Sequence, residues 1–203
     1  MEFNLVTLLR RMRVEGVLAF LLFVAGTVGG VLFAKELAGI VKPMYQALHQ
    51  KAAVLRSDTP WQLMWAIFTN NFRASVIMIL GGLLLGLLPA LYVFANGALV
   101  GFVLLMVTVE THANPILVFL AGILPHGIFE IPAYLIATAF GFRITKVLVR
   151  SIAAKENKES WKQLLQDAVA VLLWVMLLLL LAAYMESHVT PIILHQVLHT
   201  PVL

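Results

Sequence analysis

The stretch Gly122–Ala137, GILPHGIFEIPAYLIA, is almost entirely apolar, yet it contains a histidine, a glutamate and two prolines. His126 and Glu130 are four residues apart, so a helix would place both side chains on one face. Pro125 and Pro132 each lack a backbone N–H group, which removes a hydrogen bond from a helix that contains them. The stretch therefore predicts an interrupted helix that carries a polar pair.

The rest of the chain has the composition of a membrane protein. Of its 203 residues, 62% are hydrophobic and 12% are charged, whereas a soluble domain is about half apolar and roughly a quarter charged. Residues 16–34, 74–109 and 168–183 carry no charge. Because about 20 apolar residues suffice for a spanning helix, lipid is the expected solvent. The basic residues flank these segments, which argues against nucleic-acid binding, and the lack of cysteine excludes thiolate chemistry.

These features predict an all-α fold, a polytopic bundle of about five transmembrane helices in a single integral membrane domain, residues 1–203. Backbone groups in hydrocarbon must be satisfied internally, which favours helices. We expect the fourth span to be broken at Pro125/Pro132, with Gly122 and Gly127 allowing the bend. The predicted spans are 16–34, 74–93, 97–112, 116–141 and 168–185.

Two dipeptides have the composition of turns between these spans. Asn96 and Gly97 both tolerate a left-handed backbone, so they predict the connection between the second and third spans. Asn114-Pro115 predicts the connection between the third and fourth spans.

The 35–73 connection is too long for a turn and predicts external helices that lie on the membrane surface. Thr59 and Pro60 form a helix start, with threonine as the N-cap and proline in the first turn. Trp61 and Trp65 follow, and tryptophan rings favour the headgroup zone. We expect this interfacial helix to lead into the second span.

The distribution of lysine and arginine predicts the orientation in the membrane. Residues 1–15 contain three of these basic residues and the 142–167 connection contains six, whereas 35–73 contains five and the C-terminal tail none. Basic residues accumulate on the cytoplasmic side. The N-terminus and the basic 142–167 connection are therefore expected in the cytoplasm.

Glycines four residues apart indicate close packing between helices. The pairs are Gly26 with Gly30, Gly82 with Gly86, and Gly97 with Gly101. Such spacing lets helix backbones approach each other within lipid. We expect these contacts within one chain, with a homodimer as the alternative.

Three interpretations of the polar pair remain open. Glu130 could fix helix packing through a bond to His126, or the pair could line a cavity for an ion, a proton or a small polar group. As the third interpretation, His126 and Glu130 could ligate a metal for hydrolysis. Catalytic zinc takes three protein ligands, and only two are evident here, so the sequence predicts no metal, no cofactor and no catalytic residue.

The segments LPHGIFEIPA (Leu124–Ala133), IFTNNF, which contains Asn70 and Asn71, and NGALVG, which begins with Asn96 and Gly97, support a resemblance. In the chain order IFTNNF, NGALVG, LPHGIFEIPA they resemble the stage II sporulation protein M family of multi-pass prokaryotic membrane proteins. The resemblance implies a five-span fold in the cytoplasmic membrane, with no enzymatic activity of its own.

For the family's sporulation branch the resemblance also implies a scaffold that recruits peptidoglycan hydrolases during engulfment. That branch is less strict about the histidine and glutamate, whereas this chain has Pro125, His126, Glu130 and Pro132 together, as in the general branch. The leading hypothesis is a scaffold for cell-envelope proteins. The alternatives are a transporter or channel component with its site at the broken fourth span, and an intramembrane metal-dependent hydrolase.

Overall fold

A computed structural model describes the chain except for residues 1–4, 37–38, 40–58, 112–113, 154–160 and 200–203. The described residues are helical almost throughout and contain no strand. The helical elements are α1 (Leu5–Arg11), α2 (Arg13–Leu32), α4 (Pro60–Leu80), η1 (Gly81–Leu84), α5 (Leu87–Thr111), α6 (Pro115–Val118), η2 (Phe119–Ile123), α7 (Leu124–Ile152), α8 (Trp161–Tyr184), η3 (Met185–Val189) and α9 (Thr190–His199).

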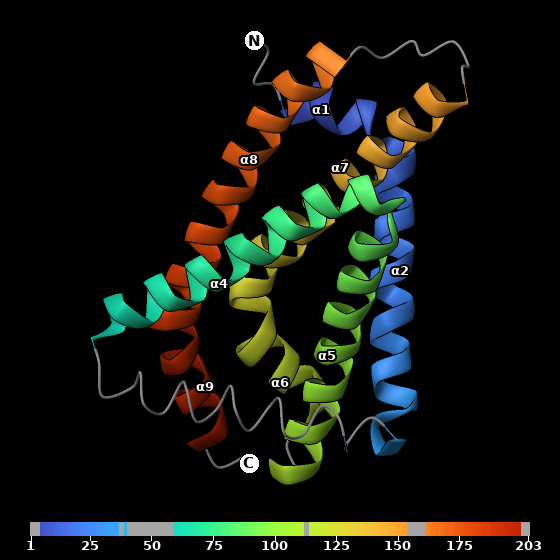
Figure 1. Cartoon of the computed structure of the whole chain (residues 1–203). Helices are drawn as coiled ribbons and strands as arrows, with labels where there is room; N and C mark the ends of the chain where they lie inside the picture. The colour runs from blue at the N-terminus through green and yellow to red at the C-terminus, as the bar shows by residue number, and fades with distance from the viewer. Residues whose placement is uncertain (1–4, 37–38, 40–58, 112–113, 154–160, 200–203) are drawn as a thin grey trace.

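Five of the described helical segments are long and apolar enough to cross a membrane, which confirms the predicted fold class. They are Arg13–Leu32, Pro60–Leu84, Leu87–Val109, Pro115–Ile152 and Trp161–Ile193. Figure 1 shows α1 at one end of the bundle and α9 at the opposite end, as an odd number of crossings requires. The helix α4 crosses the bundle obliquely, in front of α7 in this view (Figure 1).

The largest apolar core lies where α4, α7 and α8 meet. Its fully buried side chains include Met78 from α4, Phe140 from α7, and Val171 and Val175 from α8. Small residues of α7, Ala133 and Ala137 among them, let these helices pack closely. This core positions the start of α7 against α4 and the end of α8.

The helices α2 and α5 lie side by side and pack through their glycines (Figure 1). A Cβ atom on Gly30 would collide with the carbonyl oxygen of Ala98, and one on Gly101 would collide with that of Thr27. The backbones are therefore in direct contact, as the glycine spacing predicts for packing within one chain.

The predicted turn at Asn96-Gly97 is wrong, because α5 continues through both residues. The Asn96 side chain donates to the carbonyl oxygen of Tyr92 at 2.9 Å, and Gly97 packs against the Phe23 carbonyl. The turn lies instead at Leu85 and Gly86, whose φ angles are 55° and 77°. Glycine adopts such angles without steric cost. The third span therefore begins at Leu87 rather than at residue 97.

The second span begins earlier than predicted. Thr59 and Gln62 form a capping box, with Pro60 in the first turn, which confirms the helix start. However, α4 runs without a break to Leu80, so residues 60–73 continue directly into the second span and do not form a separate helix. The polar side chain of Asn71 is 8% exposed and faces the protein interior, which explains how a span can contain it. The predicted helix in 43–56 lies outside the described residues.

The start of the fourth span is confirmed at Asn114, whose side chain accepts a hydrogen bond from the Ile116 amide at 2.9 Å. The predicted interruption takes the form of a π-helical segment, η2, directly before α7. The chain bends between the labels α6 and α7 in Figure 1. Pro125 lies in the first turn of α7, whereas α7 continues through Pro132, so the expected second break is absent. One lost N–H donor does not end a long helix that is packed on several sides.

Much of the predicted 142–167 connection is helical, since α7 continues to Ile152 and α8 begins at Trp161. Arg143 is fully buried and donates to Asp167 at 2.6 Å, and Arg11 donates to both oxygens of Asp167 at 3.1 Å. Lys146 of α7 donates to Glu15 of α2 at 2.7 Å. These ion pairs tie α1, α2, α7 and α8 together at the end of the bundle where α1 lies.

Candidate functional site

The polar pair predicted from the sequence has a third member in the structure. One ligand atom each from His126, Glu130 and Glu186 lie within 4.8 Å of one another, and all three residues are half-buried. His126 and Glu130 share one face of α7, and Glu186 comes from η3. We call these three residues the polar cluster.

An asparagine from α4, the second span, holds Glu130 in place. The Asn71 side-chain amide donates to Glu130 Oε1 at 3.0 Å. The Asn70 side-chain amide in turn donates to the side-chain oxygen Oδ1 of Asn71 at 3.2 Å. Because Asn71 lies in the middle of α4, this bond crosses between two spans and fixes the orientation of the carboxyl group.

The imidazole of His126 is oriented from the other side by Thr190. Its Nδ1 atom lies 3.4 Å from the Thr190 hydroxyl oxygen. Thr190 is the first residue of α9 and is buried. Engagement of Nδ1 leaves the other ring nitrogen to meet a further ligand.

Two π-helical segments bring the cluster together. The segment η2 precedes Leu124-Pro125, and η3 precedes Thr190-Pro191, so each is followed by a proline at the second position of the next helix. A proline deprives the carbonyl four residues earlier of its donor, which loosens the regular helix at that point. Single π turns inside α-helices are frequent at functional sites. The helix α9 packs against η2, which places both irregular segments beside the cluster.

Aromatic rings hold η3 against the beginning of α4. The rings of Tyr184 and His188 stack with their centroids 4.6 Å apart. Trp61 meets the edge of His188 at 4.9 Å. The Ser187 hydroxyl lies 2.7 Å from Nδ1 of His188 and also bonds the Ala183 carbonyl. These contacts restrict the segment that carries Glu186.

The structure separates the residues singled out from the sequence into two groups. Asn70, Asn71, His126 and Glu130 meet at the cluster, and Pro125 and Gly127 shape the turn of α7 that carries it. Pro132 lies in the next turn of α7. Asn96 and Gly97 contact other residues, at the α2–α5 interface.

Glu186 and Thr190 were missed because the fifth span was predicted to end at residue 185, whereas the apolar helix extends to Ile193. The expectation of only two metal-ligand candidates is therefore wrong for the described residues. The available signal was a charge at Glu186, four residues before Thr190-Pro191, which is a helix start of the same type as Thr59-Pro60.

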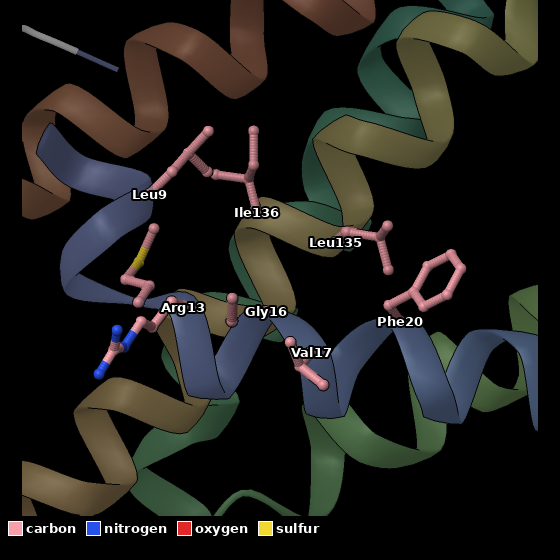
Figure 2. Close-up of a pocket in the computed structure, with 9 residues that line it drawn as sticks. Leu9, Arg13, Gly16, Val17, Phe20, Leu135 and Ile136 are labelled. Carbon is pink, nitrogen blue, oxygen red and sulfur yellow. The ribbon is translucent and has the colours of Figure 1, made fainter. Parts of the chain in front are cut away.

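A cavity of about 310 Å³ lies away from the cluster, between the α1–α2 elbow and α7. Figure 2 shows Leu9, Phe20, Leu135 and Ile136 around it, while the guanidinium of Arg13 points away. This lining is apolar and offers hydrocarbon contact rather than ligand atoms. Among the described residues, the polar cluster therefore lies apart from this cavity and from the ion pairs near α1.

The fold and the site define a multi-pass α-helical membrane protein with a histidine–carboxylate cluster between its spans. Residues 19–191 match the family described as Stage II sporulation protein M, and the chain belongs to this family. It is 32% identical over 126 residues to an uncharacterised protein of Methanocaldococcus jannaschii, covering 62% of this chain and 70% of that protein. No solved structure matches the chain.

Proposed function

We propose that the chain is a transporter or channel component that binds a cation or a proton at the polar cluster. The observation that carries this proposal is the meeting of His126, Glu130 and Glu186 within 4.8 Å, between helices long enough to span a membrane and away from the ion pairs of Arg143 and Lys146. Ionisable groups within membrane spans are costly, and they commonly mark ion or proton pathways.

The two carboxyl groups favour a bound positive charge. At such a separation two carboxylates repel each other strongly, because neighbouring helices provide a low effective dielectric constant. Arg143 and Lys146 are engaged at the other end of the bundle by Asp167 and Glu15. A proton or a cation between Glu130 and Glu186 would remove the repulsion.

The structural alternative, in which Glu130 only fixes packing, predicts a different outcome for one substitution. In Glu130→Gln the side chain keeps its size and still bonds Asn71, but it loses the charge that attracts a cation. We expect cation or proton flux into proteoliposomes to fall at least tenfold (about 1.4 kcal/mol in the barrier). Thermal unfolding in detergent should remain close to that of the unmodified protein.

The matched control is Glu36→Gln, which removes an exposed carboxyl group outside the cluster. It should leave flux unchanged. Loss of thermal stability in Glu130→Gln with flux preserved would assign the residue to packing and refute the transport proposal.

We propose as a second candidate a non-enzymatic scaffold in the prokaryotic cytoplasmic membrane, with its N-terminus in the cytoplasm, that recruits peptidoglycan-remodelling hydrolases. Membership of a family described by a sporulation stage supports it, with engulfment as the process in spore formers. Trp61 and Trp65 support it too, since both are more than half exposed at the start of α4, where a partner could dock. A homodimer is compatible with this role.

Copurification in mild detergent distinguishes the two proposed functions, transport and scaffold. The double variant Trp61→Ala, Trp65→Ala is expected to lose a peptidoglycan hydrolase that the unmodified protein retains. The control is Trp161→Ala. It removes an exposed tryptophan at the start of α8, the end of this helix that is farther from η3. Retention of the hydrolase by the double variant would contradict docking at this surface. Glu130→Gln should leave the amount of copurified hydrolase unchanged.

We propose a binding role rather than hydrolysis for the cluster itself. If Glu130 and Glu186 both ligate a cation, no carboxylate of the described cluster is left to act as general base.

A further inference from the structure

We propose that the polar cluster is a site for a divalent first-row transition-metal ion, with His126, Glu130 and Glu186 as its three protein ligands. This inference rests on the proposed cation-binding function and names the class of cation. It assigns a ligand role to Glu186, which the sequence alone does not single out.

The ligand types of the polar cluster favour a transition metal. The cluster offers one imidazole nitrogen and two carboxylate groups. Magnesium and calcium ions favour sites built of oxygen ligands, often six or more. Imidazole combined with carboxylates suits zinc, iron and manganese ions. The histidine therefore selects a transition metal over the alkaline-earth ions.

The spacing of the three ligand atoms is close to that of a metal site. Zinc binds nitrogen and carboxylate oxygen at about 2.0–2.2 Å, so two of its ligand atoms lie at most about 4.4 Å apart. The three ligand atoms of the cluster already lie within 4.8 Å of one another. Small rotations of the side chains would therefore bring all three ligand atoms within bonding distance of one ion. Water would fill the remaining coordination positions.

The charges of the polar cluster balance those of a divalent ion. A divalent ion with two carboxylates and a neutral imidazole has no net charge, which is the cheapest state for a site surrounded by hydrocarbon. A monovalent ion would leave one negative charge. Metal binding also supplies the positive charge that the proximity of Glu130 and Glu186 requires.

Hydrogen bonds around the polar cluster orient two of the three ligands. Metal-ligating histidines nearly always engage their second ring nitrogen, and ligating carboxylates are themselves hydrogen-bonded. Here Thr190 lies at Nδ1 of His126, and Asn71 donates to Oε1 of Glu130. Both partners come from elements other than α7, since Asn71 belongs to α4 and Thr190 to α9.

The test measures metal binding directly, on full-length untagged protein in lipid nanodiscs after removal of metal with a chelator. The tail residues His195 and His199, four residues apart, are replaced by alanine so that they contribute no second site. Calorimetric titration with Zn²⁺ should give one equivalent bound, and Ca²⁺ should not compete. Co²⁺ should produce visible absorption bands that Zn²⁺ abolishes.

Variants assign the ligands. Glu186→Gln is expected to weaken Zn²⁺ binding at least a hundredfold, and Asn71→Ala, which removes only the supporting bond, about 10–100-fold. Glu36→Gln should bind as tightly as the unmodified protein. Circular dichroism confirms that each variant keeps its helices. Equal affinity in Glu186→Gln and Glu36→Gln, or preference for Ca²⁺, would overturn the assignment.

The flux assay separates this inference from the proposed function. Glu130-dependent flux of protons or sodium ions without any Zn²⁺ binding would refute the metal site and leave the transport proposal intact. Stoichiometric Zn²⁺ binding without flux of any cation would support the site and refute transport.

Discussion

Replacement of Asp167 by asparagine is expected to destabilise the protein by about 3–5 kcal/mol, because it leaves the buried guanidinium of Arg143 without its carboxylate. The side chain of Arg143 is 1% exposed and lies 2.6 Å from Asp167. A charge at this depth cannot regain water when its partner is neutralised. Denaturation with SDS in mixed micelles, followed by circular dichroism, measures the loss.

Two further variants define this effect. Glu15→Gln removes the partner of Lys146, but Lys146 is 41% exposed and can rehydrate, so we expect a loss of about 0–1 kcal/mol. The double variant Asp167→Leu, Arg143→Met removes both charges and should recover most of the stability. If Asp167→Asn is no less stable than Glu15→Gln, the Arg143–Asp167 pair does not hold α7 to α8.

Replacement of Gly30 by leucine is expected to separate α2 from α5. Even the first side-chain atom would collide with the backbone of Ala98, which cannot move aside as a side chain can. Overpacking typically costs about 1–3 kcal/mol, and collision with backbone falls at or above the upper end of this range. The same SDS denaturation assay reports the loss.

The neighbouring residue supplies a matched control, because a Cβ atom on Gly29 would meet only the Phe94 ring, at 3.9 Å. Gly29→Leu introduces the same side chain into the same turn of α2 and should change stability by less than about 0.5 kcal/mol. Equal losses in the two variants would indicate that leucine disturbs α2 itself rather than its contact with α5.

The number of spans could be predicted from the sequence because it follows from composition alone. Segments without charge and of sufficient length must be helices in lipid, whatever their neighbours. The positions of the turns could not be predicted in the same way. Asn96-Gly97 satisfies the local requirements of a turn, but contact with α2 uses Gly97 for packing, and the turn falls at Leu85-Gly86.

The candidate site was predicted in part, since His126 and Glu130 are conspicuous in an apolar segment of one helix. Asn71 was quoted only as part of a motif, because its bond to Glu130 joins residues 59 positions apart. Glu186 lay just beyond the predicted end of a span, where a charge is unremarkable. Contacts between spans depend on helix rotation and tilt, which hydropathy does not encode.

For Arg143 the sequence suggested exposure to water, whereas the side chain is buried. Counted among the basic residues of a cytoplasmic connection, it contributed to the predicted orientation, yet it is a buried member of an ion pair. Charge counting assumes that a lysine or arginine near a span end faces water. Arg143 fails that condition because α7 continues to Ile152 and places it beside α8.

Because of the irregular segments η2 and η3, the site is sensitive to the insertion or deletion of a single residue in these segments. One residue advances an α-helix by about 100°. Deleting a residue from η3 would therefore restore a regular period and turn the two flanking halves of the helix relative to each other by about that angle. The present contacts could then not all persist. If Tyr184 kept its contacts with His188 and Trp61, Glu186 would no longer face Glu130. The meeting of these side chains is thus encoded in the phase of two helices as much as in the identity of the residues.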